Sequence, residues 1–281
     1  MASTTFSREE RSFVAGGVQV DLRIDGRSCT DYRNFNVKYG IVTSANGSAE
    51  VKLGKTHVIV GIKAELGEPE GATPNIGIAN FFVDCSANAS PAFEGRGGSD
   101  LALELRNGLS QIMNTRTFDY KSLCIVPGKY CWILYIDSIV LECDGNLFDA
   151  LSLAVKAALN DTLIPKLVIS GDSDDIDIDI SDDQYDIQSL DISNVPVMVT
   201  VNKVENRFVL DALPEEESCI DAMLLVSVDR YGEICGLQKF GSGGLDPELT
   251  FEMIQVAKEA GKSLNKNLEK TFKKDESMST G

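Results

Sequence analysis

Residues 131–159 read CWILYIDSIVLECDGNLFDALSLAVKAAL, and this stretch decides the fold class. Its first part, 131–142, is rich in β-branched and aromatic side chains, which predicts a strand. Asn146 then stands at the cap position of a helix, and the apolar residues after it recur at helical spacing. These residues are Leu151, Val155, Ala158 and Leu159. The stretch is therefore a strand joined by a short turn to an amphipathic helix.

Strands are also predicted in the chain before residue 131. Four segments rich in β-branched residues predict strands, and turn pairs at 46–47 and 54–55 join the first three into an antiparallel meander. The four segments are 35–42, 49–53, 57–64 and 80–85. Ser7 followed by Glu10 predicts a capping box for a short opening helix through Val14.

The chain after residue 165 repeats the order of strands first and helix last, which indicates two related lobes. Eight Asp lie between residues 171 and 186, a charge density that predicts a solvated loop or a ragged edge strand at the boundary. Further strands follow, and a long helix opens at Asp246-Pro247. The expected organisation is an N-terminal helix and arm (1–20), a first lobe (21–170), an acidic loop (171–190), a second lobe (191–274) and a disordered tail (275–281).

Composition limits the classes of function. The chain has 43 acidic and 26 basic residues and a net charge of −17, so a protein that binds nucleic acid on its own is disfavoured. Seven cysteines without a CxxC pair favour reduced thiols inside the cell over a disulfide framework or a zinc site. Neither a signal peptide nor a membrane-spanning stretch is expected.

Three patterns have both a catalytic and a structural interpretation, and the structural one is preferred for each. His57 is the only histidine and lies in a strand pattern, which excludes a histidine-based triad or a multi-histidine metal site. The Asp run lacks the glycine and the terminal Glu of a calcium-binding EF-hand loop. Residues 215–217 with Asp221 could supply paired carboxylates, although a loop of surface acids has the same sequence.

Two basic clusters are candidates for contact with a partner. Five lysines recur every four residues on the last helix, which predicts a solvated face or, as the alternative, a docking stripe for an acidic partner or RNA. They are Lys258, Lys262, Lys266, Lys270 and Lys274. The second cluster consists of Arg96, Arg106, Arg116 and Lys121. Because glycine amides surround Arg96 ahead of a helix, this cluster is the candidate RNA-contacting site.

A set of motifs carries a family resemblance. In chain order they are 21–27 (DLRIDGR), 31–33 (DYR), 47–54 (GSAEVKLG), 93–98 (FEGRGG) and 144–150 (DGNLFDA). Together they resemble the RNase PH family, and more narrowly the ring subunits of the RNA exosome within it. The likeness extends from about residue 15 to about residue 265.

The resemblance implies an α+β fold of the ribosomal protein S five domain-two type, with two related lobes of sheet and helix. It implies a place in a hetero-oligomeric ring of RNase PH-like chains, capped by RNA-binding subunits of S one and KH type. RNA would pass through the ring channel for 3'-5' degradation and processing, including that of ribosomal RNA, and associated hydrolytic nucleases would cleave it. The expected chain is a structural subunit of the nucleus, nucleolus and cytoplasm, without cofactor, metal or membrane contact.

The resemblance also implies that the chain is catalytically inert. Active relatives hold the attacking phosphate with a Gly-Gly-Thr-Arg segment, whereas here Leu147 stands in the place of Thr and Phe148 in the place of Arg. Phosphorolysis brings two anions together, and loss of one preorganised donor costs about 10²- to 10³-fold in rate. Leu147 and Phe148 are therefore lost phosphate-site positions.

The alternative is a contribution to a composite phosphorolytic 3'-5' exoribonuclease site with a catalytic ring neighbour. In a relative that is inert alone, arginines on the helix after the glycine-rich loop serve the neighbouring active subunit. The matching positions here are Asn107 and Gln111, with Arg106 and Arg116 nearby. A reduced, non-catalytic contact with RNA is expected at most.

Overall fold

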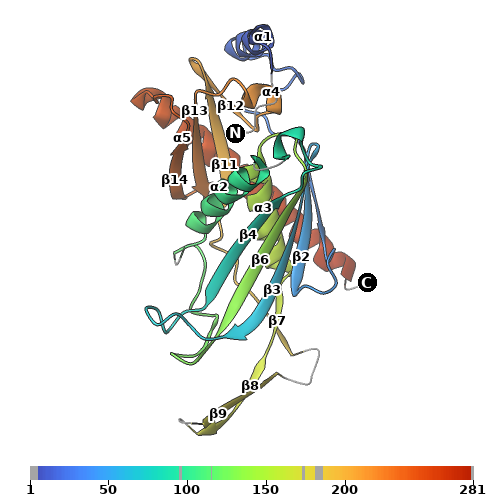
Figure 1. Ribbon diagram of the computed structural model, residues 1–281, viewed down its shortest axis with the longest axis vertical. Coiled ribbons are helices and arrows are strands. Elements are labelled where there is room, and N and C mark those ends of the chain that lie inside the picture. The colour runs from blue at the N-terminus through green and yellow to red at the C-terminus, as the bar shows by residue number, and fades with distance from the viewer. Residues whose placement is uncertain (1–5, 95–96, 115, 173–174, 181–185, 280–281) are drawn as a thin grey trace.

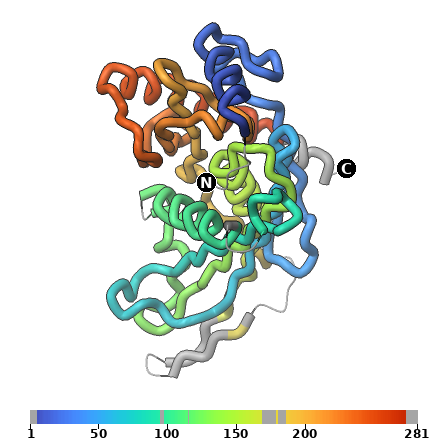
Figure 2. The backbone as a smooth tube through the Cα atoms, turned by 45° about the horizontal axis from the view of Figure 1, so that its top comes forward, coloured from blue at the N-terminus to red at the C-terminus, as the bar shows by residue number. Residues whose placement is uncertain are grey.

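Helix α3 (Leu147–Asp161) lies between two β-sheets, and each sheet is the base of one lobe (Figure 1). The computed structural model describes residues 6–94, 97–114, 116–172, 175–180 and 186–279. Figure 2 shows the same arrangement after a turn, with the second lobe in orange beside the green and blue first lobe. The α+β organisation predicted from the order of strands and helices is confirmed.

The first lobe is built on a six-stranded sheet of order β1-β2-β3-β6-β4, with β5 paired to β6. Its strands are β1 (Phe35–Tyr39), β2 (Gly47–Leu53), β3 (Thr56–Gly67), β4 (Ile78–Cys85), β5 (Cys124–Val126) and β6 (Tyr130–Glu142). The meander β1-β2-β3 is antiparallel, as predicted, and only β4 runs parallel to its neighbour β6. The connection from β4 to β6 passes through a 3-10 turn (Pro91–Phe93) and α2 (Gly97–Ile112), which packs on β4.

The second lobe is an antiparallel sheet of order β12-β11-β13-β14, covered by a long helix. Its elements are β11 (Val197–Val204), β12 (Arg207–Leu210), α4 (Pro214–Glu217), β13 (Ala222–Val228), β14 (Ile234–Phe240) and α5 (Pro247–Ser279). Helix α5 begins after Asp246 as predicted, because Asp246 Oδ1 accepts the N–H of Glu248 at 3.0 Å. Helix α1 (Arg8–Gln19) packs on β12 and α4.

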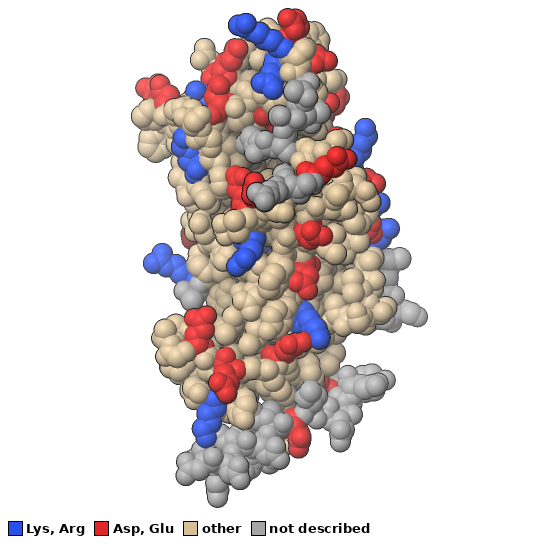
Figure 3. All heavy atoms as spheres, viewed as in Figure 1, with Lys and Arg blue, Asp and Glu red and all other residues tan. Residues whose placement is uncertain are grey.

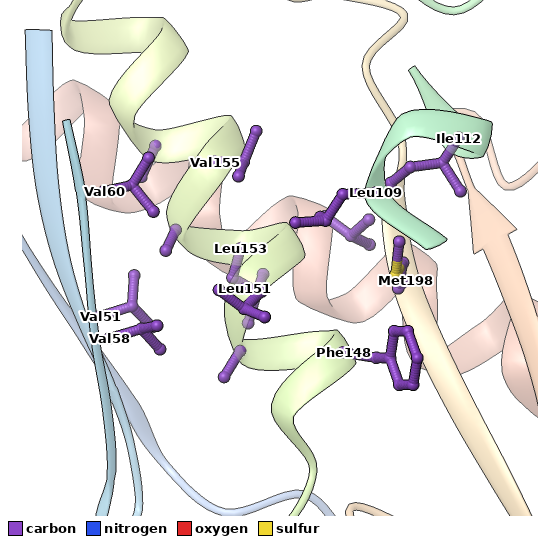
Figure 4. Close-up of a cluster of buried hydrophobic side chains, with 14 of the residues drawn as sticks. Val51, Val58, Val60, Leu109, Ile112, Phe148, Leu151, Leu153, Val155 and Met198 are labelled. Atoms are coloured by element: carbon purple, nitrogen blue, oxygen red, sulfur yellow. The ribbon is translucent and has the colours of Figure 1, made fainter. Parts of the chain in front are cut away.

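The core is continuous across both lobes because α3 is buried on all sides, from Leu147 to Leu159. In Figure 4 the side chains of Val51, Val58 and Val60, from β2 and β3, lie on one side of α3. Leu109 of α2 and Met198 of β11 lie on the other side. A helix that is buried on every face must be enclosed by other elements in this way.

For the acidic segment a solvated loop or a ragged edge strand was expected, and its described residues lie mostly in strands. Strands β8 (Leu167–Asp172) and β9 (Asp175–Ile180) pair as an antiparallel hairpin, which projects from the first lobe in Figure 1. Two further strands, β7 (Leu163–Pro165) and β10 (Ile187–Ser189), pair at its base. Asp and Ile alternate through Asp175–Ile180, which is the period of a strand, and the charge count concealed that period.

Two helices are longer than expected. The capping box at Ser7 and Glu10 is present, but α1 continues past Val14 to Gln19 because Ala15 and Val18 are buried against the second lobe. Helix α5 continues to Ser279, through most of the tail that was expected to be disordered from residue 275. No helix in the described part of the chain is long and apolar enough to span a membrane.

Candidate functional site

The turn into α3 is the segment that the family resemblance assigns to phosphate. Gly145 and Asn146 both have left-handed backbone conformations, with φ of +81° and +55°. Asn146 stands at the cap position, as predicted, but its side chain does not cap the helix. Its Nδ2 donates instead to Asp149 Oδ2 at 3.0 Å and to Asp211 Oδ1 at 2.8 Å.

Gly145→Ala is expected to lower the free energy of unfolding by about 2 kcal/mol or more. The positive φ disfavours a side chain, and a Cβ at Gly145 would lie 2.4 Å from the carbonyl oxygen of Ala212. Gly16→Ala is the matched control, because Gly16 is an exposed interior residue of α1 with nothing within 4 Å of an added Cβ. The control should gain about 0.5–1 kcal/mol in urea unfolding. Equal effects of the two changes would contradict the strained turn.

Asp211 is the centre of an ion-pair network behind this turn. Its Oδ1 accepts from Arg33 Nη2 at 2.7 Å, and its Oδ2 accepts from Arg33 Nε and Arg27 Nη1, each at 2.9 Å. Arg33 also donates to the carbonyl of Asp144 at 2.7 Å. Burial alone would raise the pKa of Asp211, but the hydrogen bonds and charge of Arg33 outweigh it and hold that pKa below its usual range. The two arginines are thus already neutralised by carboxylates.

Arg23 connects the segment just before β1 to the second lobe. Its Nε donates to Glu216 Oε1 at 2.8 Å, and both side chains are fully buried. The remaining nitrogens of Arg23 donate to the carbonyls of Leu210 at 3.0 Å and Asp211 at 2.8 Å. The DLRIDGR motif therefore has a structural use in this chain, since it supplies the arginines that hold the two lobes together.

Glu217 binds the amide of the cap residue of α3. Its Oε1 accepts the backbone N–H of Asn146 at 2.8 Å. Burial raises the pKa of the Glu217 carboxyl to about 7, although the Asn146 N–H and the charge of Arg33 oppose the rise. Helix N-termini favour negative charge, so an internal carboxyl occupies the direction from which an anion would approach this amide.

Asp149 links α3 to both lobes from inside the core. Its Oδ2 accepts from the Tyr32 hydroxyl at 2.6 Å, and its Oδ1 accepts from the Thr200 hydroxyl at 2.6 Å. Burial raises the pKa of Asp149 to about 6, against the hydrogen bonds from Thr200, Tyr32 and Asn146. The pKa of Tyr32 is raised well above its usual value by burial and by Asp149. These contacts position α3 and are not open to a ligand.

Leu147 and Phe148 are both buried in the described structure. The ring of Phe148 packs against that of Phe240 with the centroids 5.4 Å apart. A Cβ added at Gly108 on α2 would lie 2.7 Å from Phe148, so the ring fills the space between α2 and β14. The side chain that replaces the arginine of active relatives is therefore a packed part of the core.

The predicted basic cluster has three described members, and all three are exposed. Arg106 is exposed on α2, and Arg116 and Lys121 are exposed in the segment between α2 and β5. Arg96 lies outside the described residues, so its predicted contact with RNA stays a prediction. On the face drawn in Figure 3, basic side chains lie mostly singly among acidic ones.

The other candidate residues have structural surroundings. His57 Nε2 lies 2.6 Å from Glu50 Oε1 on the outer face of the first sheet. Asp221 Oδ2 accepts the N–H of Glu205 at 3.1 Å, and Glu216 is bound by Arg23. Among the described residues no group of three or more His, Cys, Asp or Glu side chains is placed to hold a metal ion.

Sequence reasoning missed the residues that close the turn. Asp211 and Glu217 lie more than sixty residues beyond Asn146 in the sequence, and no local pattern joins them to α3. The only available signal was Glu217 within the run 215–217, which has the same sequence as a surface loop. Tyr32 and Arg33 belonged to a quoted motif, but their partners could not be assigned from it.

Comparison with known proteins agrees with this geometry. Residues 31–165 match the first domain, and residues 194–260 the second domain, of the 3' exoribonuclease family called RNase PH. A Dictyostelium discoideum protein with the name exosome complex exonuclease RRP42 is 38% identical over 95% of this chain and 98% of its own length. The exosome complex component Rrp42 of Methanothermobacter thermautotrophicus is 35% identical over 89% of this chain and 90% of its own.

Solved structures show the same fold. A chain of an archaeal exosome core is 29% identical, with a TM-score of 0.77 over 93% of this chain and 96% of that chain. A chain of the Archaeoglobus fulgidus exosome with RNA bound to the active site is 30% identical, with a TM-score of 0.77 over 92% and 97%. The narrower resemblance to exosome ring subunits, of the Rrp42 type, is confirmed by these names. The chain belongs to the RNase PH family of 3' exoribonucleases.

Proposed function

We propose that this chain is a non-catalytic structural subunit of the RNA exosome core ring, where it helps to form the channel that guides RNA to 3'-5' degradation and processing. Relatives at 35–38% identity carry the name of an exosome subunit, and they are matched over most of their length. A similar solved exosome holds RNA at its active site, which supports RNA as the cargo of the ring.

The main support for a non-catalytic role is the turn at the start of α3, where groups of the protein already bind the donors that a phosphate would need. A phosphate there would need free donors and cationic charge. The amide of Asn146 already donates to Glu217, and Phe148 offers a packed ring in place of a guanidinium. The nearest arginine, Arg33, is bound by Asp211 and Asp144. Phosphate would therefore enter a site with excess negative charge and no free cation among its described residues.

The proposed partners follow from this role. They are the other RNase PH-like subunits of a hetero-oligomeric ring, cap subunits of the S one and KH type, and associated hydrolytic nucleases. A net charge of −17 suits a segment held between basic neighbours better than a chain that recruits RNA on its own. The proposal places the assembly in the nucleus, nucleolus and cytoplasm.

The chain co-purified with its ring partners should degrade end-labelled RNA no faster when inorganic phosphate is added. The reason is that its α3 turn lacks the donors that phosphorolysis requires. The measurement is release of nucleoside diphosphates, with and without phosphate, while size-exclusion chromatography shows that the assembly is intact. Phosphate-dependent release that is lost when only this chain is changed would overturn the structural role.

The same assembly tests the composite-site alternative. Arg106→Glu together with Arg116→Glu changes the exposed arginines of and after α2, and Lys55→Glu is the control at the exposed turn between β2 and β3. A non-catalytic subunit should give the same product profile in all three assemblies. Phosphate-dependent activity that falls with the arginine changes alone would favour the composite site.

A further inference from the structure

Cys124 and Cys131 are direct cross-strand partners where β5 pairs with β6. Both are free thiols. They lie on either side of the short connection at residues 127–129. Neither belongs to the α3 turn described above. Nothing in the ring role requires two thiols opposite each other, so the pair calls for a separate explanation.

The backbone pairing sets the geometry of the two thiols. The N–H of Trp132 donates to the carbonyl of Leu123 at 2.8 Å, which makes Leu123 and Trp132 a hydrogen-bonded pair. In an antiparallel ladder the next pair, Cys124 with Cys131, is then of the non-hydrogen-bonded kind. In such pairs the Cα atoms are about 4.5 Å apart and the side chains are close. The register shifts between Cys124 and Val126, so this pair is the last one of the regular ladder. A disulfide spans Cα separations of about 4.4–6.8 Å, a range that includes the spacing of such a pair.

The two thiols differ in access to solvent. Cys124 is partly exposed, and its Sγ lies 4.0 Å from the carbonyl oxygen of Pro74. Cys131 is fully buried, and burial together with the neighbouring Cys124 raises the pKa of its thiol. An exposed thiol beside a buried one is the arrangement of an attacking and a resolving cysteine.

A second pair of neighbouring cysteines provides an internal comparison. Burial raises the pKa of Cys85 to about 12 and that of Cys143 to about 11, and each value also reflects nearby negative charge. Thiolate, the reactive form, is therefore scarce at both positions near neutral pH. Exchange chemistry should begin at Cys124 rather than at this pair.

We propose that Cys124 and Cys131 form a reversible disulfide by exchange with a small-molecule disulfide of the glutathione type. The Cys124 thiolate attacks one sulfur of oxidised glutathione, the S–S bond of glutathione breaks, and one glutathione thiolate leaves. The Cys131 thiol then loses its proton and attacks Cys124 Sγ, and the second glutathione leaves as thiolate. Two protein thiols are oxidised, and one glutathione disulfide is reduced to two glutathione molecules.

The bridge would hold a segment that already makes several tight contacts. Gly128 N–H donates to the carbonyl of Pro74 at 2.8 Å, and Cys124 N–H donates to that of Lys121 at 3.1 Å. A bridge at Cys124 therefore fixes the end of the segment that carries Arg116 and Lys121.

The test uses the full-length chain equilibrated with a series of ratios of oxidised to reduced glutathione, quenched by alkylation and digested with trypsin. Cleavage after Lys121, Lys129 and Lys156 places Cys124 in peptide 122–129 and Cys131 in peptide 130–156. The expected product is these two peptides joined, lighter than their sum by two hydrogen atoms. It should appear before any loss of alkylation at Cys85 and revert when excess reduced glutathione is added.

Two variants identify the sulfur atoms, because peptide 130–156 also contains Cys143. Cys143→Ser should keep the joined peptides, and Cys124→Ser should lose them while its circular dichroism spectrum stays that of the wild type. The wild-type digest needs no variant, so a misfolded substitution leaves the test valid. The proposal is overturned if all seven thiols stay alkylated at every ratio, or if the joined peptides vanish in Cys143→Ser.

Discussion

Arg23→Ala is expected to lower the free energy of unfolding by about 3–5 kcal/mol, measured by urea denaturation. The substitution leaves the carboxylate of Glu216 buried without its cation, and both side chains of this pair are fully buried. It also removes the donors to the carbonyls of Leu210 and Asp211, at 3.0 and 2.8 Å. The cost thus comes from an unpaired buried charge and from the loss of one buried hydrogen bond at each of two carbonyls, of which that of Asp211 keeps Arg27 as a donor at 3.2 Å.

Glu216→Ala should lower the free energy of unfolding by a similar amount, because it leaves the guanidinium of Arg23 buried without its carboxylate. The double substitution should cost less than the sum of the two single ones, since removing both charges leaves neither unpaired. Glu65→Gln is the control, because the Lys63–Glu65 pair has an N–O distance of 2.8 Å but side chains 60% and 48% exposed. That change should stay within about 1 kcal/mol. If the double variant instead loses the sum of the two single losses in free energy of unfolding, Arg23 and Glu216 are not a coupled pair.

The regular elements were predictable because their signals are local. The meander β1-β2-β3 has β-branched residues between turn pairs, and α3 has apolar residues at helical spacing after Asn146. The segment Asp175–Ile180 was less well predicted because a high charge was weighed above an alternating period. Charge opposes packing only where a side chain must be buried, whereas a two-stranded hairpin can carry acids on one face.

The closed site could not be predicted in the same way. Family likeness indicated the loss of cationic donors at Leu147 and Phe148, but not what occupies the place of phosphate. Glu217 reaches the amide of Asn146 across a gap of 71 residues, and such contacts depend on how the two lobes pack. The arginine of the DYR motif likewise gave no sign that Asp211 would neutralise it.

Glu217→Gln is expected to change how stability depends on pH. An acid whose pKa rises from 4.5 to about 7 on folding holds its proton more tightly in the folded chain than in the unfolded one. Wild-type stability from this group is therefore greatest in acid, falls as the pH rises from about 4.5 to about 7, and stays low above that. The fall corresponds to about 3 kcal/mol, and it is absent from a glutamine, which can still accept the Asn146 N–H.

The measurement is urea unfolding of both proteins at a series of pH values, taken as variant minus wild type. Asp149, whose pKa of about 6 falls in the same range, contributes equally to both proteins and cancels in the difference. The difference should therefore grow in favour of Glu217→Gln between pH 4.5 and 7 and stay constant above. Glu215→Gln, on the same short helix and without a hydrogen bond from the described α3 turn, removes the same charge and is the matched control. A flat difference for Glu217→Gln would mean that the pKa of its carboxyl does not rise on folding, which would contradict its burial beside the Asn146 amide and weaken the main support for a non-catalytic subunit.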